Sequence, residues 1–154
     1  MKVQKIYIDT SVFGGYYDEE FEEYSKLLFE RIYNGDFTII FSSVTERELI
    51  DAPLLVKELS SGLPKMFVEY TELTNEVVDL ASLYIEEKVV GKTSFDDCLH
   101  IAIATILEAD YLVSWNFKHI VNVERIRGYN YVNIKNGYKI LDIRSPRELI
   151  KYEE

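Results

Sequence analysis

The sequence predicts an α/β protein with a central, mostly parallel sheet and helices on both faces. Short apolar runs recur along the chain, and most of them lack the polar alternation that marks a strand with one solvent face. Segments with apolar residues at helical spacing lie between these runs. Strands that alternate with helices require crossover connections, which place helices on both sides of a parallel sheet.

The predicted elements are located by their own patterns. The five runs expected to form strands are residues 6–8, 37–41, 67–70, 111–115 and 138–143. The clearest helical face is formed by Phe95, Cys98, Leu99, Ala102, Ile103 and Ile106. Residues 21–32 and 77–84 show the same spacing, and Pro53 and Pro64 bracket one further short helix. Glycines at positions 14, 15, 35 and 91 fall where loops or helix ends are expected.

Length and composition predict a single domain over residues 1–154, because 154 residues with 47% apolar composition can bury a core without a metal or disulfide. Cys98 is the only cysteine, and its apolar neighbours indicate a buried thiol in a reducing compartment. The first apolar run, residues 6–8, is much shorter than a signal peptide or a membrane span. We therefore expect a cytoplasmic protein that does not associate with membranes.

The net charge of −10 is unevenly distributed. Residues 1–117 carry 22 acidic and 9 basic side chains, whereas residues 118–154 carry 5 acidic and 8 basic ones. An acidic protein does not attract a nucleic-acid backbone unaided, because that binding depends on Lys and Arg displacing counterions. The charge argues against a simple electrostatic nucleic-acid binder, but the final segment leaves room for a local nucleic-acid surface.

Asp9 is the strongest single candidate for a functional residue. It directly follows the first apolar run, so it is expected at the carboxyl end of a central strand, where open parallel sheets bind ligands. The alternative is a structural turn in which the Asp9 side chain bonds to the backbone amide of Ser11. Other acids at equivalent positions favour the functional interpretation.

Two further acids lie near predicted helix starts. Glu48 follows the second predicted strand, and Asp97 opens the clearest predicted helix. Each lies three residues after a hydroxyl residue, Thr45 or Ser94, which is also the pattern of a helix capping box. Acids in a first turn gain from the helix dipole as well. Taken alone, each acid is better explained by capping than by catalysis.

The combination of the three acids points to a metal site. A parallel sheet brings the carboxyl ends of its strands and the starts of the following helices to one edge, so the three carboxylates are expected to converge. Clustered carboxylates repel one another and usually need a cation to stay ionised. Oxygen ligands without cysteine or paired histidines suit Mg²⁺ or Mn²⁺, which can activate water for attack on a phosphodiester.

Four segments also carry a resemblance to a known family. They are Asp9-Thr10-Ser11, Thr45-Glu46-Arg47-Glu48-Leu49, Asp97-Cys98-Leu99-His100-Ile101-Ala102 and Leu112-Val113-Ser114-Trp115-Asn116-Phe117. In this order and spacing, over residues 6–120, the chain resembles the PIN domain family, in particular VapC-type toxins. The resemblance implies a three-layer PIN-like fold and a Mg²⁺- or Mn²⁺-dependent endoribonuclease that cleaves RNA as the toxin of a toxin–antitoxin pair. An antitoxin protein and a homodimer are the implied partners.

The resemblance also assigns site residues. The family's metal-binding acids correspond to Asp9, Glu48 and Asp97. Glu46 and Asp96 are neighbouring alternatives. Many members carry a fourth acid just after the fourth strand, where this chain has Asn116. An amide can ligate a cation or hold water but adds no negative charge, which leaves one or two bound ions open.

Several polar residues are candidates for contact with RNA. The hydroxyl of Ser11, beside Asp9, could hold a water or a phosphate, although turn stabilisation explains it equally well. Lys118, Arg125 and Arg127 belong to a basic segment interleaved with tyrosines, a composition that suits phosphate contacts and base stacking. A solvated basic helix face is an equally good interpretation.

The two histidines are expected to be structural more than functional. His100 lies one turn after Asp97, but a lone histidine on a helix is more often a hydrogen-bonded packing residue. His119 could lie near the rim of the site, and no second histidine stands at metal-ligand spacing from it.

Two other functions compete with the nuclease. A non-catalytic PIN-like module that binds RNA or a protein is supported by Asn116 and the acidic charge, whereas the three acids argue against it. A phosphatase with Asp9 as nucleophile is disfavoured, because Ser11 stands where such phosphatases place a second acid. Carboxylates that converge would favour the nuclease, and carboxylates that point apart would favour the binding module.

Overall fold

The computed structural model of the protein describes residues 2–153. In chain order its elements are β1 (Gln4–Ile8), α1 (Thr10–Gly15), α2 (Glu22–Tyr33), β2 (Phe37–Ser42), α3 (Ser43–Glu48), α4 (Leu54–Ser61), η1 (Lys65–Phe67), β3 (Val68–Thr71), α5 (Asn75–Glu86), η2 (Lys92–Ser94), α6 (Phe95–Ile106), β4 (Tyr111–Val113), α7 (Val123–Lys135), β5 (Ile143–Arg144) and α8 (Pro146–Glu153). Helices α2, α5 and α6 coincide with the three helices predicted from apolar spacing, and α4 lies between the two prolines as expected.

The five strands form one entirely parallel sheet in the order β3-β2-β1-β4-β5. β1 lies at its centre, with Ile6 opposite Ile39 of β2 and Tyr111 of β4. The chain builds outward from β1 through β2 to β3 and then returns to the other side of β1 to add β4 and β5. On one side of β1 the chain adds strands towards β3, and on the other side it adds them towards β5. The direction in which strands are added therefore reverses between β1 and β4.

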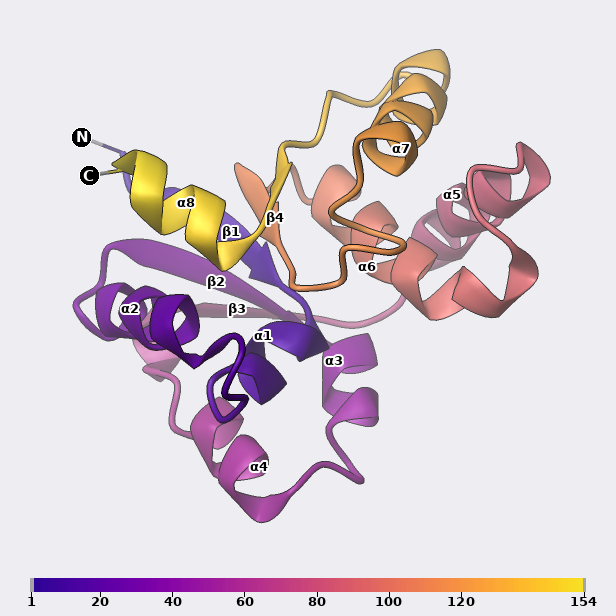
Figure 1. Ribbon diagram of the computed structural model, residues 1–154. Helices are drawn as coiled ribbons and strands as arrows, with labels where there is room; N and C mark the ends of the chain where they lie inside the picture. Colours follow the sequence, from indigo (N-terminus) through magenta and orange to yellow (C-terminus); the bar gives the residue numbers. More distant parts are fainter. Residues whose placement is uncertain (1, 154) are drawn as a thin grey trace.

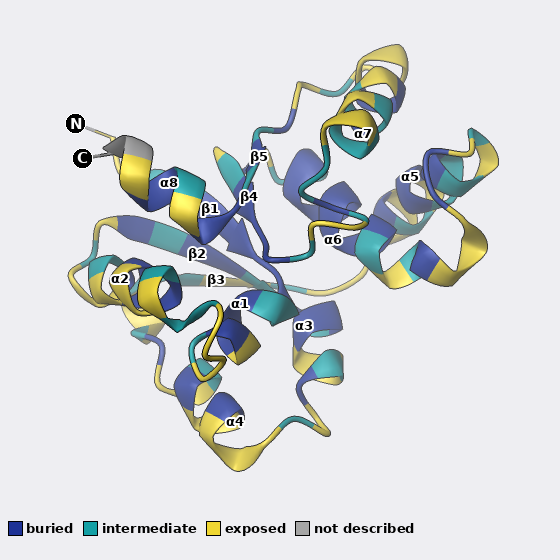
Figure 2. Ribbon diagram, in the orientation of Figure 1, coloured by how far each residue is buried: buried dark blue, intermediate teal, exposed yellow. Residues whose placement is uncertain are grey.

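Helices cover both faces of the sheet, which confirms the predicted three-layer α/β arrangement (Figure 1). Successive residues of a strand point to opposite faces. In β1, Ile6 and Ile8 pack with residues of α1, α2, α4 and α8, whereas Tyr7 packs with residues of α5, α6 and α7. The inner strands β1, β2 and β4 are accordingly mostly buried, whereas the edge strand β3 and the outer faces of the helices are partly or fully exposed (Figure 2). The position of Tyr7 on the α6 side becomes important for the site.

The last two strands are shorter than the sequence predicts, because side chains occupy the backbone groups that a longer strand would use. The predicted strand 138–143 is wrong except for Ile143, and Asn130 accounts for this. Its side chain accepts a hydrogen bond from the N–H of Leu141 at 2.7 Å and donates one to the Leu141 carbonyl at 3.0 Å. β4 stops at Val113 because the next two free N–H groups, at positions 115 and 116, donate to serine hydroxyls.

Cys98 is a free cysteine whose side chain is fully buried, as its neighbours in the sequence predict. Burial, followed by the charge of Asp97, raises the pKa of the Cys98 thiol to about 12.

Across residues 2–153, every helix is too short or too polar to span a lipid bilayer.

Candidate active site

Acidic and polar side chains gather at the carboxyl edge of the sheet. Asp9 directly follows β1, residues 114–116 follow β4, Glu48 ends α3, and Asp97 lies in the first turn of α6. β1 and β4 are neighbours whose connections leave in opposite directions, and such a reversal forms the crevice in which parallel sheets bind ligands. Figure 1 shows α1 and α3 at this end of β1.

Asp9 is held by two serine hydroxyls. Ser11 Oγ donates to Asp9 Oδ1 at 2.6 Å, and Ser114 Oγ donates to Oδ2 at 2.7 Å, while only 4% of the residue is exposed. Asp9 stands at the N-cap of α1 but its side chain makes no capping bond, so the predicted alternative of a turn bond to the Ser11 amide is wrong. Burial raises the pKa of Asp9, although the charge of His100 and the two hydroxyls oppose the increase.

Glu48 receives two hydrogen bonds on one oxygen. Thr10 Oγ1 donates to Glu48 Oε1 at 2.5 Å, and His100 Nε2 lies 2.6 Å from the same atom. Burial alone would raise the pKa of Glu48, but the hydrogen bond and charge of His100 outweigh burial, so this pKa lies below its ordinary value. The capping-box alternative is wrong, because α3 begins earlier and Ser42 Oγ accepts the N–H of Thr45 as its cap.

Asp97 is half-buried beside Asn116, whose Nδ2 donates to Asp97 Oδ1 at 3.4 Å. Ser94 precedes α6 without a capping bond from its side chain, so a capping box does not explain Asp97 either. Burial raises the pKa of Asp97, and the negative charges of Asp9 and Glu48 raise it further against the opposing histidines. The negative charges of Asp9 and Glu48 thus disfavour ionisation of Asp97.

The neighbouring acids that the sequence left as alternatives point elsewhere. Glu46 accepts the hydroxyl of Tyr70 at 3.0 Å, and Asp96 Oδ1 accepts Arg47 Nη2 at 2.8 Å. Both acids are exposed. The structure thus brings Glu48 and Asp97 to the site in preference to Glu46 and Asp96.

Behind Glu48 lies a buried chain of polar groups that sequence reasoning missed. His100 Nδ1 lies 2.5 Å from the hydroxyl of Tyr7, and that hydroxyl lies 2.7 Å from Ser42 Oγ. Only 2% of His100 is exposed. A tyrosine inside an apolar strand was the signal in the sequence that could have revealed these linked polar groups. A buried tyrosine hydroxyl usually has a hydrogen-bond partner. His100 is a hydrogen-bonded buried residue, as expected, and its partner is a site carboxylate.

Asn116 uses both ends of its amide. Its Oδ1 accepts the backbone N–H of Lys118 at 3.2 Å and of His119 at 3.0 Å, while Nδ2 faces Asp97. Its own N–H donates to Ser114 Oγ at 2.9 Å, the same hydroxyl that donates to Asp9. Asn116 therefore borders the acids and orders the loop that follows β4.

The Nδ1 atom of His119 is buried without a hydrogen-bond partner among the described residues.

The expected RNA contacts are only partly gathered here. Ser11 contacts Asp9, and Lys118 is exposed next to Asn116. Arg125 donates to the carbonyl of Val89, and Arg127 lines an exposed hollow between α5 and α7. In the described part of the chain, no hydrogen bond or ion pair joins either arginine to the acids. Their role in binding stays a prediction.

The donor atoms of the site suit a hard divalent cation. They are carboxylate and hydroxyl oxygens, which Mg²⁺ and Mn²⁺ prefer. The predicted metal ligand Asn116 does not add to them as placed, because its oxygen accepts two backbone N–H groups. Within residues 2–153, no group of three Asp, Glu, His or Cys side chains is arranged to hold a metal ion, so the expected convergence of the three carboxylates on one cation is not seen in this structure. The carboxylates are instead held by hydroxyls, His100 and Asn116.

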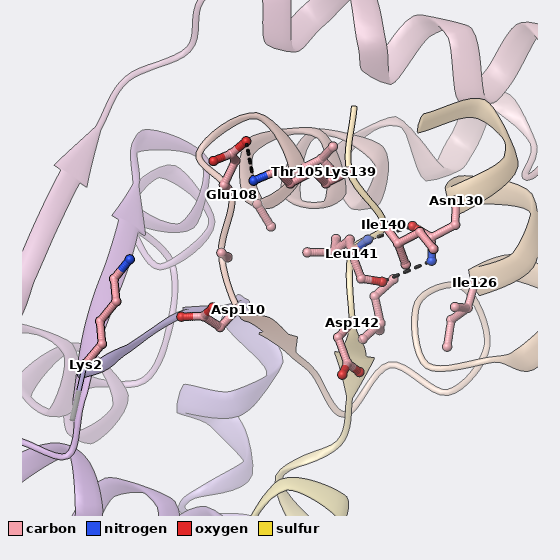
Figure 3. A pocket seen from close by; sticks show the side chains of 13 residues that line it. Lys2, Thr105, Glu108, Asp110, Ile126, Asn130, Lys139, Ile140, Leu141 and Asp142 are labelled. Atoms are coloured by element: carbon pink, nitrogen blue, oxygen red, sulfur yellow. Dashed lines mark hydrogen bonds and ion pairs between the residues drawn. The ribbon is translucent and has the colours of Figure 1, made fainter. Parts of the chain in front are cut away.

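A separate cavity of about 550 Å³ lies at the opposite, amino-terminal edge of the sheet (Figure 3). Its charged lining includes Glu108 and Lys139, which form an ion pair at 3.4 Å, and Asp110, which accepts the N–H of Lys5. Since none of the three site acids lines it, this cavity is not part of the candidate site.

Comparison with known proteins identifies the fold as PIN-like. No family model matches the sequence, and no curated protein matches it significantly. Among solved structures, VapC20 of Mycobacterium tuberculosis, a toxin that cleaves the sarcin–ricin loop, is 13% identical with a TM-score of 0.58, over 73% of this chain and 91% of that one. A chain of VapBC2 from Rickettsia felis, crystallised with promoter DNA, is 18% identical with a TM-score of 0.55, over 92% and 98%. The protein thus shares the fold of VapC-type PIN-domain toxins.

Proposed function

We propose that the protein is a metal-dependent endoribonuclease and the toxin of a toxin–antitoxin pair. The observation that carries the proposal is that Asp9, Glu48 and Asp97, from three different parts of the chain, all lie at the carboxyl edge of the sheet, where the sheet connections reverse. The likeness of the fold to a toxin that cleaves the sarcin–ricin loop supports a nuclease reaction.

In this proposal Asp9, Glu48 and Asp97 hold Mg²⁺ or Mn²⁺, and Asn116 borders the ion. The bound ion would neutralise the phosphodiester and favour attack of water on phosphorus. Ser11 and Ser114 fix the Asp9 carboxylate, while Glu48 Oε2 and Asp97 Oδ2 make no hydrogen bond within residues 2–153 and could bind the ion. Lys118, Arg125 and Arg127 supply the positive charge that the RNA backbone needs.

Asp97→Asn tests this proposal against a matched neighbour, Asp96→Asn. The first change removes a carboxylate charge from the site, so metal-dependent cleavage of RNA is expected to fall by at least about a hundredfold. The second change removes the same charge from an exposed ion pair with Arg47 and is expected to leave cleavage near the wild-type rate. Rates are measured on a fluorescent single-stranded RNA with Mn²⁺ or with excess chelator. Undiminished cleavage by Asp97→Asn, or in chelator, would contradict the proposal.

A non-catalytic RNA- or protein-binding module is the second candidate function, and Asn116 in place of a fourth acid favours it. The same assay separates the two candidates. RNA binding without any metal-dependent cleavage by the wild-type protein would support the module.

We also propose an antitoxin partner and a homodimer. Ile50, Leu54, Leu55 and Met66 are large apolar side chains that are exposed along α4 and its flanking segments, and such surfaces often mark protein interfaces. One of the matched structures is a VapBC assembly on DNA, which supports a protein partner. A strictly monomeric mass at micromolar concentration would contradict the homodimer.

A further inference from the structure

His100 is the best-connected buried polar residue near the candidate site. Both of its ring nitrogens have partners: Nε2 lies 2.6 Å from Glu48 Oε1, and Nδ1 lies 2.5 Å from the Tyr7 hydroxyl. The Tyr7 and His100 rings also meet edge to face, with centroids 5.5 Å apart. The imidazole is therefore fixed by packing and by hydrogen bonds on both sides.

The chemistry of the partners decides which way these bonds run. An ionised carboxylate only accepts hydrogen bonds, so Nε2 must carry a proton and donate it to Glu48. When the ring is neutral, Nδ1 accepts from Tyr7, whose oxygen accepts from Ser42, whose oxygen accepts the N–H of Thr45 at 3.2 Å. When the ring is cationic, Nδ1 donates to the Tyr7 oxygen and Tyr7 donates to Ser42, while the Nε2–H bond to Glu48 is the same. Every polar group in this buried chain is satisfied, and the Nε2–H bond to Glu48 is its outermost link.

Glu48 binds its donors through one oxygen, and the other oxygen has no hydrogen bond within the described residues. Glu48 is the last residue of a six-residue helix and has a long, partly exposed side chain that would otherwise sample several rotamers. Thr10 and His100 both bind Oε1, so these two donors set the direction in which Oε2 points. Donors that orient a ligating carboxylate in this way strengthen metal binding without touching the metal.

We propose that His100 is a positioning residue for Glu48, held in place by Tyr7 and Ser42, and that it donates to Glu48 instead of binding the metal. This inference rests on the proposed function, because it assumes that Glu48 holds the cation. It adds that the first shell of the ion is built from oxygen alone and that the buried hydroxyl chain determines how well the site binds.

Three substitutions at position 100 test the proposal. His100→Gln keeps an N–H within reach of Glu48, His100→Asn is too short to reach it, and His100→Leu removes both nitrogens. Mn²⁺ affinity is measured by calorimetry on protein shown to be folded by circular dichroism. We expect His100→Leu and His100→Asn to lose about 10- to 100-fold in affinity and His100→Gln to recover most of the loss. If His100→Leu does not fold, the Mn²⁺ affinities of His100→Gln and His100→Asn are compared to decide the test.

A matched pair of tyrosine variants tests the supporting chain. Tyr7→Phe removes the hydroxyl that holds His100, whereas Tyr84→Phe removes an equally buried hydroxyl that bonds Asn133 at 2.5 Å. Only Tyr7→Phe is expected to weaken Mn²⁺ binding. Nitrogen NMR of the His100 ring, with and without Mg²⁺, is expected to show a protonated Nε2 in both states.

Two results would overturn the proposal: Mn²⁺ affinity unchanged in His100→Leu or His100→Asn, or an Nε2 that loses its proton when Mg²⁺ is added. Both require a wild-type protein that binds the ion and cleaves RNA. A wild-type protein that does neither contradicts the proposed function itself, so the two failures are distinguishable.

Discussion

Asp9, Glu48 and Asp97 carry the same functional group in different surroundings, and the surroundings set their pKa values in different directions. The pKa values of Asp9 and Asp97 are raised, first of all by burial, whereas that of Glu48 is lowered through His100. Ionised Asp9 and Asp97 therefore destabilise the metal-free fold near neutral pH, and a bound cation would relieve this. Function and stability conflict at these two residues.

The stability of the metal-free protein is expected to show this conflict for Asp97. An acid whose folded pKa is raised contributes stability that is present below its unfolded pKa of about 4 and is lost as the pH rises through the folded pKa. Asp97→Asn removes that loss. We expect the variant to be more stable than wild type at pH 7 in chelator, with the gap narrowing towards pH 4. Urea denaturation at several pH values measures it, and a gap independent of pH would contradict the assignment.

Asn116 makes a second prediction at the same site. Asn116→Asp adds a negative charge beside Asp97, so it should tighten metal binding by on the order of 1 kcal/mol or more and slightly destabilise the metal-free protein. Asn122→Asp is the control, since Asn122 also caps backbone N–H groups and has no contact with the acids among the described residues. Calorimetric titration decides, and unchanged affinity in Asn116→Asp would place this residue outside the site.

The acids of the site could be predicted from the sequence, but the groups that hold them could not. Asp9 and Asp97 stand directly beside recognisable strand and helix patterns. Ser114, in contrast, reaches Asp9 across 105 positions, and Tyr7 reaches His100 across 93. Hydroxyl contacts at such separations leave no local pattern, because they depend on the strand order and on which face of a strand each residue occupies.

Elements were predictable where an apolar pattern is long. α6 matches its predicted bounds, whereas β5 has two residues because Asn130 takes the backbone groups of Leu141. The segment after β4 is likewise shaped by side chains: Trp115 stacks on Phe21 at a centroid distance of 4.5 Å and donates to Ser25 Oγ at 2.8 Å. These contacts join the start of α2 to the loop that carries Asn116.

Gly15 allows that packing and gives a prediction for the element. A Cβ atom at position 15 would lie 2.7 Å from the Trp115 ring and 2.9 Å from Ser25 Oγ, so the indole would have to move. Gly15→Ala is expected to destabilise the protein by about 1–3 kcal/mol and to weaken metal binding through the displaced loop. Gly14→Ala, whose Cβ would meet nothing within 4 Å, is the control. Equal denaturation midpoints for the two variants would show that the close approach is unimportant.

Over the whole molecule, the basic segment near the C-terminus is less free than its charge count indicates. Lys135 pairs with Glu87, Lys139 with Glu108 and Arg144 with Asp142. These pairs support the interpretation of much of the segment as solvated surface that offsets local acids. A protein of net charge −10 does not attract the RNA backbone as a whole, so a cation at the acidic site gains importance for binding.

The same charge distribution favours a basic protein partner, which is the last prediction. An arginine of an antitoxin could pair bidentately with the carboxylates of the site, while apolar side chains of the partner cover Leu54, Leu55 and Met66. Tagged protein from the native host, with both genes at natural levels, is expected to retain a small basic protein. Because the apolar contact is insensitive to ionic strength, the complex should weaken with added salt without dissociating completely. Recovery of free protein alone, at low and high salt, would count against an antitoxin.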